Sequence, residues 1–345
     1  MAADPYITNY SQTYSEFGFQ QSKLWPVDTL CMTIAGANTA KTAILKIKAC
    51  FPDSVVGFIP DKSKSDLHFI KYTLDLMRNR FLSVSRGATQ DNLSLDKILS
   101  FPILAPDAAE QHRIGAILSA YDDLIENSQR RIKILESMAR ALYREWFVHF
   151  RFPGHEGHPR VASSFGEIPQ GWEVKKLGDI LELNYGKALK KEDRRGGPFP
   201  VYGSSGVVGT HDTSLVKGPG IIIGRKGNVG SVFWCDEDFF VIDTAYFVTS
   251  RLPLPYLYYV LPTLNFINSD AAVPGLSRNQ AYMLDILVPP ALVLENFCEL
   301  AGTFERQVAN FERQIQSLRR TRDLLLPRLL SGQIDVEQFS KEVTA

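Results

Sequence analysis

The sequence has no excess charge of either sign, since 38 Lys and Arg residues balance 38 Asp and Glu residues. A uniformly basic surface for binding nucleic acid is therefore excluded, and any such contact must come from local clusters. The sequence also lacks any apolar run of about eighteen residues or more, and its N-terminus lacks the basic-then-apolar pattern of a signal peptide. These absences predict a cytoplasmic protein that does not contact a membrane.

Cysteine and catalytic motifs are scarce as well. The four cysteines lie far apart in the sequence, at Cys31, Cys50, Cys235 and Cys298. Their spacing argues against a zinc site or a disulfide framework. The segment His155–His158 resembles a metal chelate, but it lies in a Gly- and Pro-rich stretch without further ligands, so we expect no metal site.

No constellation of catalytic residues is evident either. The glycine-rich segment Gly224–Gly230 fits neither the dinucleotide fingerprint nor a Walker loop. The sequence contains no adenine-methylation motif, helicase lysine loop or nuclease carboxylate cluster. We therefore expect no catalytic residue and no cofactor in this chain.

What the sequence does contain is a long heptad pattern that occurs twice. Apolar positions step by four and three alternately from Ile114, and the same rhythm returns 183 positions later, from Phe297. The seam residues are Ile114, Leu118, Tyr121, Ile125, Ile132, Leu135 and Leu142 in the first copy, and Phe297, Phe304, Val308, Phe311, Ile315, Leu318 and Leu325 in the second. A heptad seam alone is typical of a dimerisation coiled coil, whereas its duplication favours an antiparallel pair within one chain.

Each seam covers about 33 residues and predicts a helix roughly 50 Å long. That length exceeds one turn of B-DNA, about 34 Å, so such a pair could place two DNA-reading domains on neighbouring turns. Pro327 lacks an amide donor, so we expect Leu329 to lie beyond a kink or the end of the second helix.

The globular segments repeat in the same order as the helices. Thr33–Ala40 aligns with Ile223–Gly230, which places Asn38 at the position of Asn228, 190 residues later. However, Trp172 precedes Asn228 by 56 residues, whereas only 37 residues precede Asn38. We therefore expect the first globular domain to be incomplete at its beginning.

Three segments of the second globular domain, 186–197, 224–230 and 275–280, carry side chains suited to DNA. The segment 186–197 has five cations and two anions, and Arg and Lys can contact guanine or phosphates. The alternatives are a solvated loop there, a structural hairpin at 224–230, and a helix cap by Ser277. The expected DNA contacts are Lys187, Lys190, Arg194, Arg195, Arg225, Lys226, Asn228, Arg278 and Asn279 in the second domain, and Asn38, Thr39, Lys41, Arg86, Gln90 and Asn92 in the first.

Several motifs occur in a characteristic order. Ile-Pro-Gln-Gly-Trp at 168–172 precedes Leu-Gly-Asp-Ile at 177–180, while 146–154 and 325–332 follow the two helices. In this order, with the internal repeat, the chain resembles the specificity subunit of type I restriction-modification systems through to about residue 335.

The resemblance implies a subunit that binds double-stranded DNA without doing chemistry. Two target-recognition domains would each read half of a bipartite asymmetric sequence, with conserved helices setting the spacer. Modification subunits would carry S-adenosylmethionine and methylate adenine. A restriction subunit would translocate and cut with ATP and magnesium.

The fold class expected is α+β, with two mixed α/β target-recognition domains separated by two long antiparallel coiled-coil helices in a pseudo-two-fold repeat. The expected divisions are an incomplete first domain at 1–106, a first helix at 107–150, a connector at 151–164, a second domain at 165–289, a second helix at 290–333 and a tail at 334–345. The alternative function is a coiled-coil scaffold, or an inactive gene fragment, without DNA recognition of its own.

Overall fold

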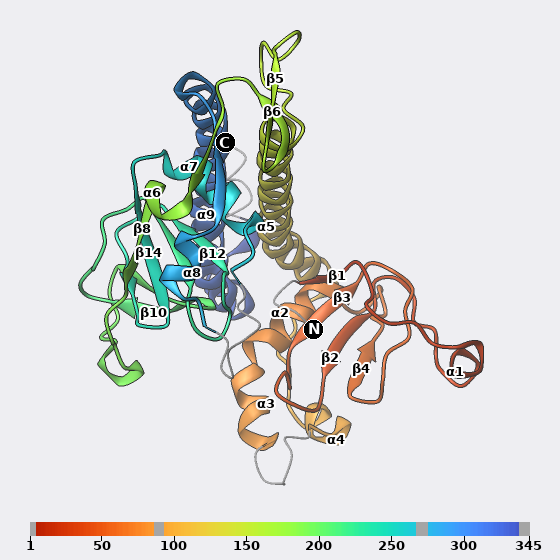
Figure 1. Ribbon diagram of the computed structural model, residues 1–345. Helices are drawn as coiled ribbons and strands as arrows, with labels where there is room; N and C mark the ends of the chain where they lie inside the picture. The colour runs from red at the N-terminus through yellow and green to blue at the C-terminus, as the bar shows by residue number, and fades with distance from the viewer. Residues whose placement is uncertain (1–4, 86–92, 267–274, 338–345) are drawn as a thin grey trace. The chain divides into compact units, whose positions relative to one another are not determined.

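The computed structural model describes residues 5–85, 93–266 and 275–337. The chain divides into two compact units, the first formed by residues 1–131 and 311–345 and the second by residues 132–310. Both boundaries fall inside a long helix, so each long helix contributes residues to both units (Figure 1).

Unit 1 is built on a four-stranded sheet with the order β1-β3-β2-β4. Its elements are β1 (Tyr6–Ile7), α1 (Glu16–Gln20), β2 (Leu30–Thr33), β3 (Thr42–Leu45), β4 (Val55–Phe58), α2 (Leu67–Leu76), α3 (Arg78–Ser85) and α4 (Leu95–Leu99). The strand β2 is antiparallel to β3 and β4, whereas β1 joins β3 in parallel. Both central strands are buried along their whole length, so their apolar runs form the core together with Phe81 and Leu93.

Unit 2 contains several small sheets, the largest with the order β12-β11-β14-β8. Its strands are β5 (Arg160–Ser163), β6 (Gly166–Pro169), β7 (Glu173–Lys176), β8 (Leu181–Tyr185), β9 (Phe199–Gly203), β10 (Gly206–His211), β11 (Gly220–Gly224), β12 (Val232–Cys235), β13 (Phe240–Val241), β14 (Ala245–Ser250) and β15 (Asp285–Val288). Its short helices are α6 (Leu177–Ile180), α7 (Leu254–Val260) and α8 (Arg278–Tyr282), with single helical turns at Arg144–Val148, Lys191–Asp193 and Leu261–Thr263.

The two units repeat the same strand pairing. In each, a central strand lies between two antiparallel neighbours, β2 between β3 and β4 in unit 1 and β11 between β12 and β14 in unit 2. In both units, the first residue after the central strand donates its amide to the carbonyl of the residue just before β4 or β14. This hydrogen bond runs from Ile34 to Ser54 at 2.8 Å in unit 1 and from Arg225 to Thr244 at 2.9 Å in unit 2. Ile34 therefore corresponds to Arg225, and the alignment that paired Ile34 with Gly224 is corrected by one residue.

The long helices are α5 (Ala108–Tyr143) and α9 (Ala291–Leu330). In unit 1 the beginning of α5 packs against the end of α9, with Ile114 and Leu118 clustering around Leu329. In unit 2 the residues at and after the end of α5 pack against the beginning of α9, and the rings of Phe147 and Phe297 lie 4.8 Å apart. The helices therefore run antiparallel, and every expected seam residue is buried or half-buried.

The expectation that the second helix could end before Leu329 is wrong, because α9 continues through Pro327 to Leu330. Leu329 is 1% exposed and packs with Phe69 and Tyr72 of α2. Burial of this apolar surface outweighs the one amide hydrogen bond that the proline removes.

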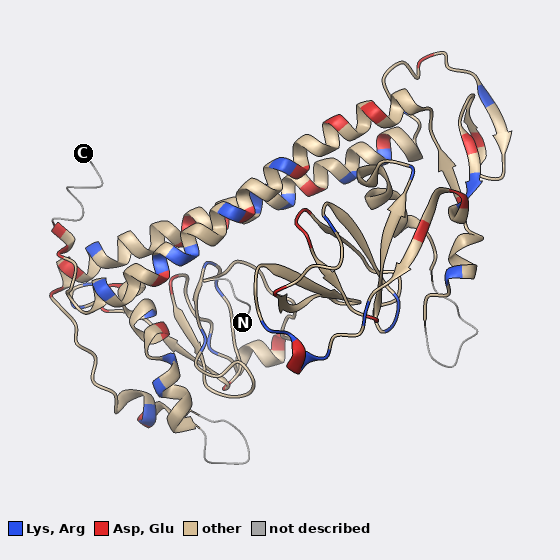
Figure 2. Ribbon diagram, turned by 90° about the vertical axis from the view of Figure 1, so that its left-hand side faces the viewer, with Lys and Arg blue, Asp and Glu red and all other residues tan. Residues whose placement is uncertain are grey.

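The expected fold class is confirmed, because two mixed α/β domains are each followed by a long helix. Lys and Arg residues are interspersed with Asp and Glu residues along both long helices (Figure 2). None of the helices in the described ranges combines the length and the apolar character needed to cross a bilayer.

Candidate nucleic-acid interface

Three segments of unit 2 meet at one end of its largest sheet. Tyr185 is the last residue of β8 and lies opposite Tyr246 of β14. The loop after β11 begins with Arg225, whose carbonyl accepts a hydrogen bond of 2.9 Å from the amide of Leu276. A bridge between Lys226 and Gly275 continues this contact. The expected DNA-binding segments at 224–230 and 275–280 are therefore brought together, beside the end of β8.

Two guanidinium groups share one tyrosine ring in this cluster. The Cζ atoms of Arg225 and Arg278 lie 4.8 Å and 4.5 Å from the centroid of Tyr185. Arg225 donates to the carbonyl of Asp243 at 3.1 Å, and Arg278 donates to the carbonyl of Leu183 at 3.4 Å. We call Tyr185, Arg225 and Arg278 the arginine-tyrosine cluster.

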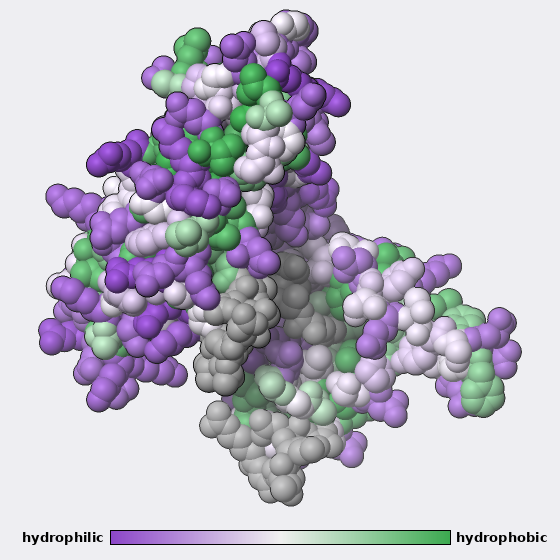
Figure 3. All heavy atoms as spheres, viewed as in Figure 1, coloured by the Kyte–Doolittle hydropathy of each residue, from purple (hydrophilic) through white to green (hydrophobic). Residues whose placement is uncertain are grey.

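The arginine-tyrosine cluster has no internal counter-charge. Within the part of the chain that the structure describes, no carboxylate forms an ion pair with Arg225 or Arg278. Tyr185 is 46% exposed, and the visible surface of these strands is largely hydrophilic (Figure 3). Two half-buried guanidinium groups without a carboxylate partner, beside an exposed ring, are suited to an anionic ligand such as a phosphate.

The environment of the two tyrosines also differs. A side-chain hydrogen bond with Tyr246 and the charges of both arginines lower the pKa of Tyr185 below its ordinary value. Burial raises the pKa of Tyr246 to about 12, and its hydroxyl donates to the carbonyl of Leu276 at 3.1 Å. Tyr246 is therefore a structural support, whereas Tyr185 is the ring presented to solvent.

The loop after β11 is shaped by glycines and by polar side chains. Gly227 and Gly230 have positive φ angles, which most other residues avoid. The exposed Asn228 donates from Nδ2 to Ser205 Oγ at 3.2 Å. Lys226 is exposed beside it. The loop thus holds a cation and an amide at the surface, next to the arginine-tyrosine cluster.

The other candidates of unit 2 have different surroundings. Lys187 and Lys190 are exposed, and no carboxylate in the described ranges pairs with them. Arg194 is half-buried and donates to the carbonyl of Val208 at 2.8 Å, so its guanidinium supports the loop. Arg195 is 3.5 Å from a carboxylate oxygen of Asp212.

Asn279 lines a hollow of the same domain next to the arginine-tyrosine cluster. It is exposed and, with Arg278 and Arg251, lines a cavity of about 650 Å³ beside the first residues of β8. Ser277 precedes α8 but makes no side-chain capping bond, so the capping role weighed for it is wrong. Asn279 and Arg278 therefore stand next to each other at the surface, on a helix that Ser277 does not cap.

Unit 1 presents fewer of its candidates. Asn38 is exposed and Lys41 is half-buried. Thr39 is 1% exposed, and its hydroxyl donates to the carbonyl of Gly36 at 2.7 Å. The expectation that Thr39 contacts DNA is therefore corrected, because its side chain stabilises the turn. Three further candidates lie outside the described residues, namely Arg86, Gln90 and Asn92.

Sequence reasoning missed Tyr185, the residue at the centre of the arginine-tyrosine cluster. A signal was available, since an aromatic residue two positions before Lys187 is the interleaving of rings and cations that nucleic-acid surfaces use. Among the described residues, no group of three or more His, Cys, Asp or Glu side chains could hold a metal ion.

Comparison with known proteins agrees with this geometry. The family described as type I restriction modification DNA specificity domain matches residues 2–137 and 169–277. The type I restriction enzyme MjaIX specificity subunit of Methanocaldococcus jannaschii is 27% identical over 97% of this chain and 84% of its own length. The type I restriction enzyme HindI specificity subunit of Haemophilus influenzae is 23% identical, over 74% of each chain.

A solved structure shares the fold. The crystal structure of the S subunit of a type I restriction-modification system from M. genitalium has a TM-score of 0.60 and 18% identity, and the match covers 95% of this chain and 88% of that one. The family match covers both globular units and more than half of the sequence. The chain belongs to the type I restriction-modification DNA specificity family.

Proposed function

We propose that this chain is the non-catalytic subunit that reads a bipartite DNA sequence for a type I restriction-modification complex. The observation that carries the proposal is the arginine-tyrosine cluster. Tyr185 and Arg225 lie within the segment 169–277 that matches the specificity family, and Arg278 follows it directly. The two half-buried guanidinium groups of the cluster have no carboxylate partner in the described ranges, which leaves their charges available to a DNA phosphate.

The residues around the cluster supply both kinds of DNA contact. Asn228 and Asn279 are exposed amides of the type that pairs with adenine in the major groove. Lys187, Lys190 and Lys226 are exposed cations suited to phosphates. One domain therefore carries side chains suited to base contacts and side chains suited to phosphate contacts.

The chemistry would belong to partner subunits. Modification subunits would bind S-adenosylmethionine and methylate adenine, and a restriction subunit would use ATP and magnesium to translocate and cut. The long helices α5 and α9, with mixed charges along their surfaces, would be the docking surface for the modification subunits (Figure 2). The expected divisions at 106, 150, 164, 289 and 333 remain part of this proposal.

Expression of the full chain with its modification subunits tests the proposal. Sequencing of methylated adenines in those cells should reveal one bipartite motif, and the motif should disappear when this chain is omitted. The full chain alone, incubated with labelled S-adenosylmethionine and DNA, should transfer no methyl group. Methylation that is independent of this chain, or methylation by the chain alone, would overturn the assignment.

A further inference from the structure

The internal repeat allows the arginine-tyrosine cluster to be compared between the two units. The amide of Leu276 bonds the carbonyl of Arg225 at 2.9 Å, and the amide of Leu93 bonds the carbonyl of Ile34 at 2.8 Å. The five-residue helices α8 and α4 begin two residues after these leucines, at Arg278 and at Leu95. The position of Arg225 is therefore Ile34 in unit 1, and that of Arg278 is Leu95.

Neither counterpart can bind an anion. Ile34 packs against the apolar core of unit 1, and Leu95 is 51% exposed. Both arginines of the cluster are thus replaced by apolar residues at the corresponding positions of unit 1.

We propose that Tyr185 is a positioning residue that holds Arg225 and Arg278 as a clamp for one DNA phosphate, and that this anchor belongs to the second repeat alone. The inference deepens the proposed function and rests on it. It assigns a role to Tyr185. It also predicts that the second recognition domain makes a contact to the DNA backbone that the first does not make.

The physical argument begins with the freedom of long side chains. A free arginine loses rotamer entropy when it binds a phosphate, and a ring that already holds the guanidinium reduces this loss. Each guanidinium also donates one bond to a backbone carbonyl, of Asp243 or of Leu183, and keeps other N–H groups free. The two cations repel one another, and a phosphate between them would remove this repulsion.

The phenol gives the clamp a dependence on pH. The groups that face Tyr185 are Arg225 from the loop after β11, Arg278 from α8 and Tyr246 from β14. Ionisation of Tyr185 would place a negative charge near the two guanidinium groups and compete with the phosphate. Because the pKa of Tyr185 is lowered, this competition begins below the ordinary range of a tyrosine.

Binding of the full chain to a fluorescein-labelled 40-base-pair duplex of mixed sequence, followed by anisotropy across a salt series, tests the clamp. We expect Arg278→Ala and Arg225→Ala each to weaken binding about tenfold and to reduce the salt slope by about one. Tyr185→Leu, which removes the ring, should weaken binding severalfold although both arginines remain. Leu95→Ala is the matched control at the same position of the first repeat and should leave binding unchanged.

A second measurement tests the ionised phenol. Tyr185→Phe keeps the ring, so it should bind at neutral pH like the natural chain but lose the fall in affinity as the pH rises toward the ordinary pKa of a tyrosine. Circular dichroism of each variant establishes whether it is folded, and if Tyr185→Leu does not fold, the affinities and salt slopes of Arg225→Ala and Arg278→Ala decide whether the clamp forms.

The outcomes distinguish the clamp from the function on which it rests. If the natural chain fails to bind the duplex in the presence and absence of its modification subunits, the proposed function fails. If it binds, but the two arginine variants keep its affinity and salt slope, the clamp is refuted while DNA recognition stands. An unchanged pH profile in Tyr185→Phe refutes the competition between the ionised phenol and the phosphate, and natural affinity in a folded Tyr185→Leu chain refutes the positioning role of the ring.

Discussion

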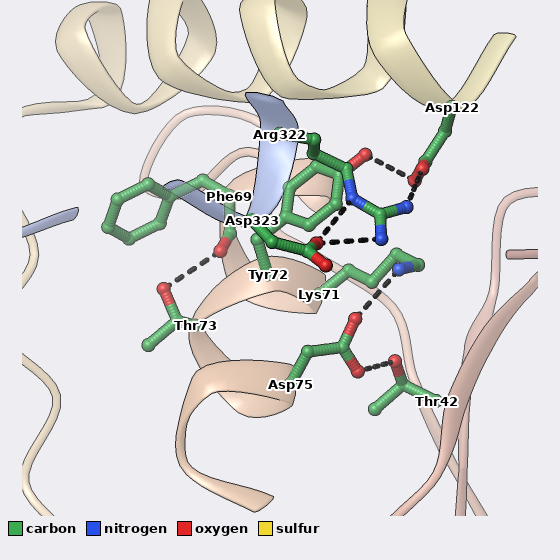
Figure 4. Close-up of polar contacts among 9 residues, drawn as sticks. All are labelled: Thr42, Phe69, Lys71, Tyr72, Thr73, Asp75, Asp122, Arg322 and Asp323. Atoms are coloured by element: carbon green, nitrogen blue, oxygen red, sulfur yellow. Dashed lines mark hydrogen bonds and ion pairs between the residues drawn. The ribbon is translucent and has the colours of Figure 1, made fainter. Parts of the chain in front are cut away.

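Arg322 of α9 forms an ion pair with Asp122 of α5, a carboxylate whose side chain is 2% exposed (Figure 4). The hydroxyl of Tyr72 in α2 donates to the same carboxylate at 2.6 Å. Arg322 also contacts Asp323 at 2.8 Å, and burial together with the charge of Asp122 raises the pKa of Tyr72. Three helices of unit 1 are therefore joined through one buried and fully paired charge.

Replacing Arg322 should be costly, because it would leave Asp122 buried without its cation. We expect Arg322→Ala to lower the free energy of unfolding by about 3 kcal/mol, as for other broken buried pairs. Urea denaturation of the full chain measures this change. Asp323→Asn is the matched control, since Asp323 is exposed and its loss should cost less than about 1 kcal/mol. If Arg322→Ala and Asp323→Asn lower the free energy of unfolding by the same amount, the buried pair does not contribute as argued.

The second repeat lacks this arginine, and its carboxylate behaves differently. Glu305 lies 183 positions after Asp122 and meets the hydroxyl of Tyr259 at 3.5 Å. The residue 183 positions before Arg322 is Ala139. Burial is the main cause that raises the pKa of Glu305 to about 7, and the charge of Asp236 adds to it.

This raised pKa predicts a stability that depends on pH. The folded chain binds the Glu305 proton more tightly than the unfolded chain, so the stability conferred is present below about pH 4.5 and is lost as the pH rises to about 7. Glu305→Gln should therefore match the natural chain near pH 5 and be more stable at pH 8, by about 1–3 kcal/mol. Thermal unfolding at both values measures the difference, with the exposed Glu299→Gln as control. A variant less stable than the natural chain at pH 8 would contradict this account.

Features with a regular period were predictable from the sequence, and features made by tertiary contact were not. The heptads placed both long helices, because a buried seam repeats every seven residues. Pro327 was misjudged because the packing of Leu329 is invisible in the local sequence. Thr39 appeared to be a surface residue of a polar loop, although its hydroxyl turns inward to the carbonyl of Gly36. The alignment of Tyr185 with two distant arginines requires the sheet register.

Gly224 is the residue on which the loop of the interface depends. A Cβ atom at this position would lie 2.1 Å from the carbonyl oxygen of Asn228 and 2.4 Å from Ser231 Oγ. Gly224→Ala must therefore displace the loop backbone, and we expect a loss of stability of about 1–3 kcal/mol. DNA affinity should fall as well, because Arg225 and Asn228 move with the loop. Gly332→Ala is a useful comparison, since its Cβ meets no atom within 4 Å, although its φ of 72° carries some strain. Unaltered DNA affinity in a folded Gly224→Ala chain would show that the loop does not contact DNA.

Base-reading and phosphate-binding side chains should respond differently to a change in DNA sequence. Asn279 is an exposed amide, so Asn279→Ala should weaken binding to the matched duplex by about 1–3 kcal/mol and relax the preference at one base pair. Lys187 is an exposed cation, so Lys187→Ala should weaken binding to matched and mismatched duplexes alike and reduce the salt slope by about one.

The duplexes for this comparison follow from the motif found by methylated-adenine sequencing, with one base pair changed at a time. Lys175→Ala provides the matched control for a lost cation, since Lys175 is paired with Glu173 at 2.6 Å and should not contribute to DNA binding. Anisotropy at two salt concentrations separates the two classes, because a phosphate contact depends on salt and a base contact depends on sequence. If Asn279→Ala loses the same affinity for every duplex, Asn279 does not read a base and is instead a phosphate contact.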